Sequence, residues 1–315
     1  MTVSDLEVPV VAGVPALAEV GGATRRRSRD VVTGLVALTK PRIVELLLVT
    51  TVPTMLLARR GMPGLGLVVA TVAGGALAAG GANALNMVYD RDIDARMSRT
   101  KRRPLVTGQV PLGGAVVFAL ALEAGAFAVL WAVANLLAAS ITLGAAAFYV
   151  GVYTALLKRR TRHNIVIGGA AGAAPVLVAW AAVTGGVSPV AWGLFAVIFL
   201  WTPPHFWALA VRFRDDYAAA DVPMLPAVTD VGTVCNQILV YSVVLALTSV
   251  AVGAVGGLGP VYLAGSSALG AGFVVKAWQL RAAPSPRRAL AFFHWSISYL
   301  TLLFVLVAVV AFLPR

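Results

Sequence analysis

The stretch Asn86-Met-Val-Tyr-Asp90-Arg-Asp92-Ile-Asp94 follows a long apolar run and precedes the basic run Arg99-Thr-Lys-Arg-Arg103. The apolar run, residues 64–86, is long enough to cross a bilayer as a helix, which takes about 20 apolar residues. Acidic side chains at a membrane edge are costly to leave unpaired and usually mark function. The stretch therefore predicts a transmembrane helix with a polar site at its end.

The composition indicates a polytopic membrane protein with an all-α fold. Of its 315 residues, 59% are hydrophobic and only 12% are charged. Apolar runs of spanning length recur along the chain, and we expect nine transmembrane helices packed as a bundle. They lie near residues 42–58, 64–86, 111–131, 134–156, 165–184, 189–211, 234–255, 259–280 and 289–312.

The positive charges indicate how this bundle is oriented. All lysines and arginines except Arg59, Arg60 and Arg315 fall in segments that would share one side of the membrane. Cytoplasmic loops are enriched in Lys and Arg, so this pattern predicts an N-in, C-out topology in a plasma membrane. It also accounts for the net charge of +12 without nucleic acid. Residues 1–32 are polar and predict a disordered cytoplasmic arm before a membrane domain at 33–315.

Six of the 13 acidic residues lie in two loops that this topology places on the cytoplasmic face. They are Asp90, Asp92 and Asp94 after the second span, and Asp215, Asp216 and Asp221 after the sixth. Asn86, Asp90 and Asp94 are spaced to share one helix face, and Asp92 would point away.

A row of oxygen ligands suits Mg²⁺, which usually shares its coordination shell with a phosphate. The basic run would complete a phosphate clamp. We therefore expect a diphosphate held by Mg²⁺ between the two loops. The simpler interpretation is a solvated helix end whose acids pair with neighbouring arginines.

Several motifs in the chain resemble those of the UbiA-type intramembrane prenyltransferases. The pattern Asn86-xxx-Asp90-xxx-Asp94, followed by Arg99-Thr-Lys-Arg-Arg103-Pro-Leu105-xx-Gly108, is similar to their first signature. Further motifs narrow the likeness to the branch that alkylates haem, and the resemblance covers about residues 33–310. They are Leu38-Thr-Lys-Pro-Arg42, Tyr153-Thr-Ala-Leu-Leu-Lys-Arg159, Asn164-Ile-Val-Ile-Gly-Gly169, Trp201-Thr-Pro-Pro-His-Phe-Trp-Ala-Leu209 and Asp215-Asp-Tyr217 with Val222-Pro-Met-Leu-Pro226.

The resemblance implies an enzyme that transfers the farnesyl group of farnesyl diphosphate to the 2-vinyl group of haem B. Addition of water would then give haem O, with Mg²⁺ as cofactor and haem B as a substrate. Asn86, Asp90, Asp94 and Asp216 match the family's catalytic motifs, with Asp90, Asp94 and Asp216 as the expected metal ligands. The expected substrate-binding residues are Arg42, Arg99, Lys101, Arg103, Tyr153, Lys158, His205, Arg212 and Asp215.

One departure from the family pattern concerns the second loop. The wider superfamily has a carboxylate four residues before the position of Asp216, where this chain has Arg212. Arg212 would then contact phosphate, and the second metal's shell is in question. As for partners, the lipid bilayer surrounds the domain, and a haem O product implies transfer to a haem A synthase or a terminal oxidase.

Three further features lie inside the spans. His205 could ligate haem iron, or it could be a hydrogen-bonded interfacial histidine. Pro203-Pro204 would break the sixth span within the bilayer and free carbonyls that only a cavity could satisfy. Glu123 lies mid-span and must face the bundle interior, in a role the sequence does not indicate.

Two other functions are compatible with parts of this pattern. An aromatic prenyltransferase of quinone synthesis would use the same acidic loops with another acceptor, although the segment around His205 argues against it. A secondary transporter would place its coupling acids near the bilayer midplane. Here the acids cluster at one face beside cations, which favours the enzyme.

Overall fold

The computed structural model describes residues 28–314, apart from the side chains of residues 28–29 and 42–48, and every regular element in this part is helical. The predicted arm falls largely on residues 1–27, outside the described residues, and the first helix begins at Ser28. In chain order the helices are α1 (Ser28–Leu38), α2 (Pro41–Arg59), α3 (Leu65–Tyr89), α4 (Arg91–Arg96), α5 (Leu112–Val133), α6 (Leu136–Ala147), η1 (Phe148–Leu157), α7 (Asn164–Thr184), α8 (Pro189–Arg212), α9 (Arg214–Ala219), α10 (Leu225–Val228), α11 (Val231–Gly256), α12 (Gly259–Ala282) and α13 (Pro286–Val310).

Long helices lie at the nine predicted spans, counting α6 and η1 as one continuous rod within the described chain. Seven of them are long and apolar enough to cross a membrane. The other two are α2, whose side chains are only partly described, and α12, which is less apolar because of its glycines, serines and Lys276. The all-α membrane bundle is thus confirmed, whereas the count of nine spans and the N-in orientation stay predictions.

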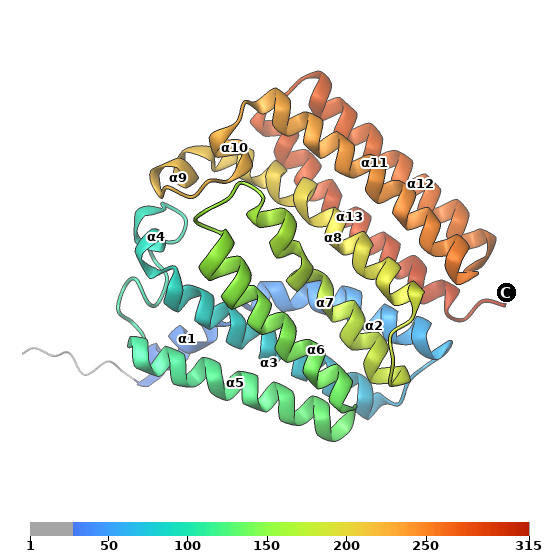
Figure 1. The fold of residues 1–315 in the computed structure, drawn as a ribbon, viewed down its shortest axis with the longest axis horizontal. Helices are drawn as coiled ribbons and strands as arrows, with labels where there is room; N and C mark the ends of the chain where they lie inside the picture. Colours follow the sequence, from blue (N-terminus) through green and yellow to red (C-terminus); the bar gives the residue numbers. More distant parts are fainter. Residues whose placement is uncertain (1–27, 315) are drawn as a thin grey trace, which may run out of the picture.

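The helices form one bundle in which α2 packs against α3, α7 and α13 and so joins the first helices to the last (Figure 1). On one side, α3 packs against α5 through small residues, which let membrane helices approach closely. A Cβ at Gly81 would lie 2.8 Å from the Ala119 carbonyl oxygen. On the other side, α8, α11, α12 and α13 enclose the largest buried cluster, which includes the rings of Tyr262, Phe273 and Tyr299.

Glu123 of α5 is buried against α3, as its position in the span predicted, and neither carboxylate oxygen has a hydrogen-bond partner among the described residues. The prediction of a broken sixth span is wrong, because α8 is helical through Pro203 and Pro204. Proline removes a donor, but its fixed φ is compatible with a helix. The Thr202 hydroxyl donates to the Ile198 carbonyl oxygen at 2.8 Å in the turn before the prolines.

The short helices α4, α9 and α10 gather at one end of the bundle, and the C-terminal end of the chain lies at the opposite end (Figure 1). A hydrophobic cluster joins them: Ile93 and Met97, near α4, pack with Val222 and Met224, near α10. This cluster fixes the loops after α3 and α8 against each other. The fold thereby brings together two acidic segments more than 120 residues apart in sequence, as the contacts below show.

Candidate active site

The acidic row at the end of α3 is held by an almost unbroken run of helical hydrogen bonds. Regular helix ends at Tyr89 and resumes at Arg91, but the Asp90 amide still donates to the Asn86 carbonyl at 2.9 Å. The Asp94 amide donates in turn to the Asp90 carbonyl at 2.8 Å. Asn86, Asp90 and Asp94 therefore follow one another at successive helical turns, although Asn86 belongs to α3, Asp94 to α4, and Asp90 to the junction between them.

Asp90 is completely buried and is surrounded by donors. The Lys158 ammonium forms an ion pair with its Oδ2, and the Asn86 amide donates to the same oxygen at 2.7 Å. Arg159 lies 3.7 Å from the other oxygen, Oδ1. This oxygen is buried yet has no hydrogen-bond partner among the described residues. A buried carboxylate needs such compensation, and its unpartnered oxygen remains able to accept a further ligand.

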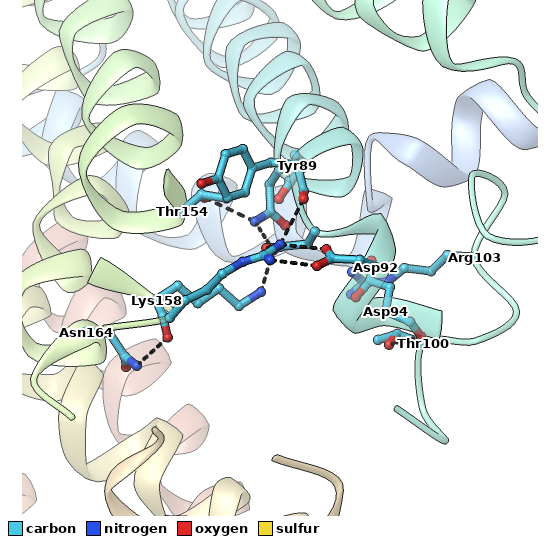
Figure 2. A network of polar contacts seen from close by, with 12 residues as sticks. Tyr89, Asp92, Asp94, Thr100, Arg103, Thr154, Lys158 and Asn164 are labelled. Atoms are coloured by element: carbon cyan, nitrogen blue, oxygen red, sulfur yellow. Dashed lines mark hydrogen bonds and ion pairs between the residues drawn. The ribbon is translucent and has the colours of Figure 1, made fainter. Parts of the chain in front are cut away.

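Asp94 has a cation of its own. The Arg103 guanidinium lies 2.6 Å from its Oδ2, and Thr100 donates to its backbone carbonyl at 3.0 Å. Arg103 and Lys158 thus approach the acidic row from separate segments, which Figure 2 shows on either side of it. The predicted clamp residues from the loops after α3 and after η1 are therefore brought together.

Two residues in contact with Asn86, namely Thr154 and Lys40, were not among the predicted site residues. Thr154 is buried, accepts a hydrogen bond from the Asn86 amide at 3.1 Å, and donates to the Tyr149 carbonyl at 2.9 Å. It lies on η1, a π-helical end to the span, and π-helical segments are frequent at functional sites. Thr154 belongs to the quoted motif Tyr153–Arg159, so that motif was the signal that could have identified it, whereas the sequence offered no signal for the π-helix.

Lys40 is the second missed residue, and it precedes α2 in a left-handed turn with φ of 52°. Its ammonium donates to the side-chain oxygens of Asn83 at 3.2 Å and Asn86 at 3.1 Å. Burial, together with the nearby charges of Arg103 and Lys158, lowers the pKa of Lys40 to about 7. Because Lys40 belongs to the quoted motif Leu38–Arg42, that motif was the signal that could have identified it.

Asp92 is half-exposed and pairs with Arg159, the same guanidinium that lies beside Asp90 Oδ1. Both of its oxygens accept hydrogen bonds from Arg159, each at 2.7 Å, which is a bidentate arrangement. Arg159 also donates to the Tyr89 carbonyl at 3.0 Å and lies over the Tyr89 ring at 5.0 Å. The bonds from Arg159 lower the pKa of Asp92. The Asp92–Arg159 pair ties the end of η1 to the end of α3 beside the Lys158–Asp90 pair.

The second acidic loop meets the first through Asp216. The Ser98 hydroxyl donates to Asp216 Oδ2 at 2.6 Å, and this bond lowers the pKa of Asp216. Arg96 pairs with Asp221 at 3.2 Å, and Arg99 lies over the Phe213 ring at 5.6 Å.

Three of the predicted residues face solvent: Lys101 of the first loop, and Arg212 and Asp215 at the start of the second. No group of three acidic, histidine or cysteine side chains stands at metal-binding distance within the described residues. The loops therefore converge, but Asp216 does not join Asp90 and Asp94 in one preformed cluster.

The remaining predicted residues lie farther along the spans. The ring of His205 stacks on Trp201 at 4.1 Å and on Phe293 at 4.5 Å, and its Nδ1 lies 2.7 Å from the Ser296 hydroxyl. This is the geometry of a packed, hydrogen-bonded histidine between α8 and α13. Tyr153 of η1 stacks on Tyr149 at 5.4 Å. The side chain of Arg42 lies outside the described residues.

The comparison that decides the family covers most of the chain. The profile of the UbiA prenyltransferase family matches residues 47–312. The chain belongs to this family. Among solved UbiA-type structures, a homologue from Aeropyrum pernix superposes with a TM-score of 0.64 at 19% identity, covering 84% of this chain and 95% of that one. A homologue from Archaeoglobus fulgidus bound to DMAPP and Mg²⁺ gives a TM-score of 0.60 at 18% identity, over 87% of this chain and 99% of that one. At these identities the likeness shows the fold of a UbiA-type prenyltransferase.

Curated relatives are much more similar in sequence. The protein named protoheme IX farnesyltransferase 1 from Saccharopolyspora erythraea is 54% identical over 91% of this chain and 92% of its own length. A protoheme IX farnesyltransferase from Frankia casuarinae is 52% identical over 88% and 97%. This UbiA-family prenyltransferase is accordingly a multi-pass membrane enzyme, which excludes the transporter interpretation.

Proposed function

We propose that the chain transfers the farnesyl group of farnesyl diphosphate to the 2-vinyl group of haem B, with addition of water, to give haem O and diphosphate. The observation that carries the proposal is identity above 50%, over about nine-tenths of the chain, to relatives named protoheme IX farnesyltransferase. The haem O product would pass to a haem A synthase or to a terminal oxidase.

The acidic row fits the Mg²⁺ that accompanies DMAPP in the Archaeoglobus fulgidus homologue. Asp90 offers a buried oxygen that no described residue hydrogen-bonds, and Asp94 lies one turn away. Oxygen donors of this kind are the ones that Mg²⁺ prefers. Asp90 and Asp94 would hold the ion, with Asn86 in support and Asp216 approaching from the second loop. When bound, Mg²⁺ neutralises charge on the diphosphate leaving group.

The chain's own cations would take part in the same neutralisation. Lys158 and Arg103 already contact Asp90 and Asp94, so each is within reach of a diphosphate seated on the acidic row. As the C1–O bond of the farnesyl group breaks, its electron pair leaves with the diphosphate, and preorganised cations stabilise that developing charge. Arg99 and Lys101, on the exposed loop above, would hold the outer phosphate, with Arg212 and Asp215 at the rim. Arg42, Tyr153 and His205 stay proposed substrate-binding residues.

The farnesyl cation must be shielded from water until the vinyl group attacks it. The π electrons of the vinyl group form the new C–C bond, and the resulting cation takes the oxygen of water, which releases a proton. The apolar bundle below the acidic row supplies the water-poor surroundings that this sequence needs. Tyr149 and Tyr153 lie on the same π-helical segment as Thr154. Their stacked rings would form part of the apolar wall beside the diphosphate.

The test is a pigment assay in cells whose membrane lacks its own haem O synthase. Extracted haem is analysed by mass, with Asp90→Ala as the control for the acidic row. We expect haem O from the intact chain and haem B alone from the variant, with both proteins inserted in the membrane. Haem B alone from the intact chain would refute the proposed acceptor. Prenylated hydroxybenzoate in the same extract would then identify a quinone-type acceptor.

A further inference from the structure

A groove between the C-terminal end of α12 and the start of α13 is separate from the acidic row. It has a volume of about 490 Å³. Its polar lining is Lys276, Gln279 and Arg288, and its apolar lining includes Trp278, Leu280 and Phe292. Trp278 is 57% exposed, whereas Phe292 is fully buried beneath. The groove thus combines an apolar floor, an exposed indole and two cations.

The charges around the groove are unbalanced. Residues 231–314 contain no aspartate or glutamate, and their cations are Lys276, Arg281, Arg287 and Arg288. Among the described residues, the Arg288 guanidinium donates only to backbone carbonyls, those of Gln279 at 3.3 Å and Ala283 at 3.2 Å. Within the described residues, neither Lys276 nor Arg288 forms an ion pair. The groove therefore lacks an internal counterion.

The groove lies at the end of the bundle that carries the acidic row, which the predicted topology places at the membrane surface. α12 runs back along α11, and Arg281 near its end donates to Asn236 near the start of α11 at 2.5 Å. The start of α11 follows α10, so this end of the α12–α13 pair is the end that also carries α4 and α9 (Figure 1). Exposed tryptophans at such a level are typical of residues at the lipid headgroups.

We propose that this groove binds the headgroup of an anionic phospholipid. Lys276 and Arg288 would contact the phosphodiester, Trp278 would pack beside the glycerol, and the apolar floor would take the first part of an acyl chain. Cations between membrane helices bind anionic headgroups in this way. If these cations only reflected the general enrichment of cytoplasmic loops in lysine and arginine, they would be spread over the loop surface. Instead, Lys276 and Arg288 line one concave surface that has an aromatic floor. The inference does not depend on the proposed reaction.

The test measures lipid binding to the purified full-length protein in detergent by native mass spectrometry. We compare phosphatidylglycerol with phosphatidylcholine of the same acyl chains, and add glycerol 3-phosphate as a soluble phosphate. The wild type is expected to prefer phosphatidylglycerol. Each cation near an anionic headgroup is worth about 5-fold in affinity. We thus expect Lys276→Gln to weaken the first bound phosphatidylglycerol about 5-fold, and Lys276→Gln with Arg288→Gln about 30-fold.

The matched control removes two charges of the same kind outside the groove, Arg59→Gln with Arg287→Gln, and should bind as the wild type does. Lys276→Arg should also retain binding. The single Lys276 variant keeps the test valid should loss of Arg288 unfold the α12–α13 hairpin, since the Lys276 side chain forms no hydrogen bond or ion pair within the described residues. Unchanged binding in the Lys276 variant, an equal loss in the control, or equally tight binding of glycerol 3-phosphate would each overturn the proposal.

Discussion

The pairing of Lys158 with Asp90 makes a quantitative prediction that separates stability from catalysis. Asp90 is completely buried and Lys158 is mostly buried, so replacing Lys158 by methionine leaves a buried carboxylate with too few partners. Removing one partner of a buried ion pair costs about 3–5 kcal/mol. In a protein of this size about 1 kcal/mol corresponds to roughly 2 °C in melting temperature, so Lys158→Met should lower it by about 6–10 °C.

The double variant Asp90→Asn with Lys158→Met removes both charges, and it should recover part of the lost stability. We expect a coupling energy of about 2 kcal/mol, because the neutral amide can still accept from the Asn86 side chain. Turnover should not recover with stability. Asp90→Asn, alone or in the double variant, should lower turnover by more than 100-fold, since the leaving group loses about 3 kcal/mol or more of stabilisation.

The assay is a double-mutant cycle read twice, by thermal unfolding in detergent and by haem O formed per protein. Asp92→Asn provides a matched control, because it is the same chemical change two residues away on an exposed carboxylate. Strictly additive melting temperatures would refute the buried ion pair. Turnover restored in the double variant would refute the role of Asp90 in the reaction.

Four further outcomes are expected. Asp92→Asn breaks a half-exposed bidentate pair with Arg159, so kcat/KM should fall about 5-fold, corresponding to ~1 kcal/mol, and Asp92→Glu should restore part of it. Because Arg159 lowers the pKa of Asp92, the pair's contribution to stability should be complete above about pH 4 and be lost as the pH falls through the lowered value, which unfolding at graded pH would measure. His205→Phe keeps the stack on Trp201 but loses the Ser296 bond, so we expect a stability loss of about 1 kcal/mol and an unchanged absorption spectrum of bound haem; a spectral change would instead indicate iron ligation. Chelation of divalent cations should abolish haem O formation and Mg²⁺ should restore it; turnover that persists in chelator would contradict the metal assignment.

The helical framework was predictable because a membrane span carries its own signal. The run expected at 189–211 is α8, Pro189–Arg212, and the run expected at 134–156 is the α6–η1 rod, Leu136–Leu157. In a bilayer each spanning segment must satisfy its own backbone hydrogen bonds, so length and hydrophobicity nearly suffice. The broken helix expected at Pro203 was wrong because proline weakens a membrane helix without always ending it.

The site was predictable only where charges share a short segment. Asn86, Asp90 and Asp94 could be placed on one face from spacing, and Arg103 follows them closely in sequence. The contact of Thr154 with Asn86 could not be predicted in this way, because the orientation of Thr154 depends on the wider π-helical turn of η1, which no local sequence pattern indicates. The roles assigned to these residues stay predictions.

Lys40 was missed for a different reason. From the sequence, Lys40 counts as one more cation of the cytoplasmic side. In the structure, its left-handed turn directs the side chain toward Asn83 and Asn86. Topology rules use the number of basic residues near a span and give no information on which of them enters the site.

The ion pairs of the acidic row also bear on which ligands the site selects. Two carboxylates there face two cations, so the pairs Asp90–Lys158 and Asp94–Arg103 leave little net charge to attract a free divalent ion. A lone ion bound at Asp90 Oδ1 would lie among Lys158, Arg159 and Arg103 with no further anion to offset its charge. A metal that arrives with a diphosphate brings anionic oxygens for these cations. The site is therefore expected to bind the complex of metal and diphosphate. Free Mg²⁺, even at high concentration, should not occupy it.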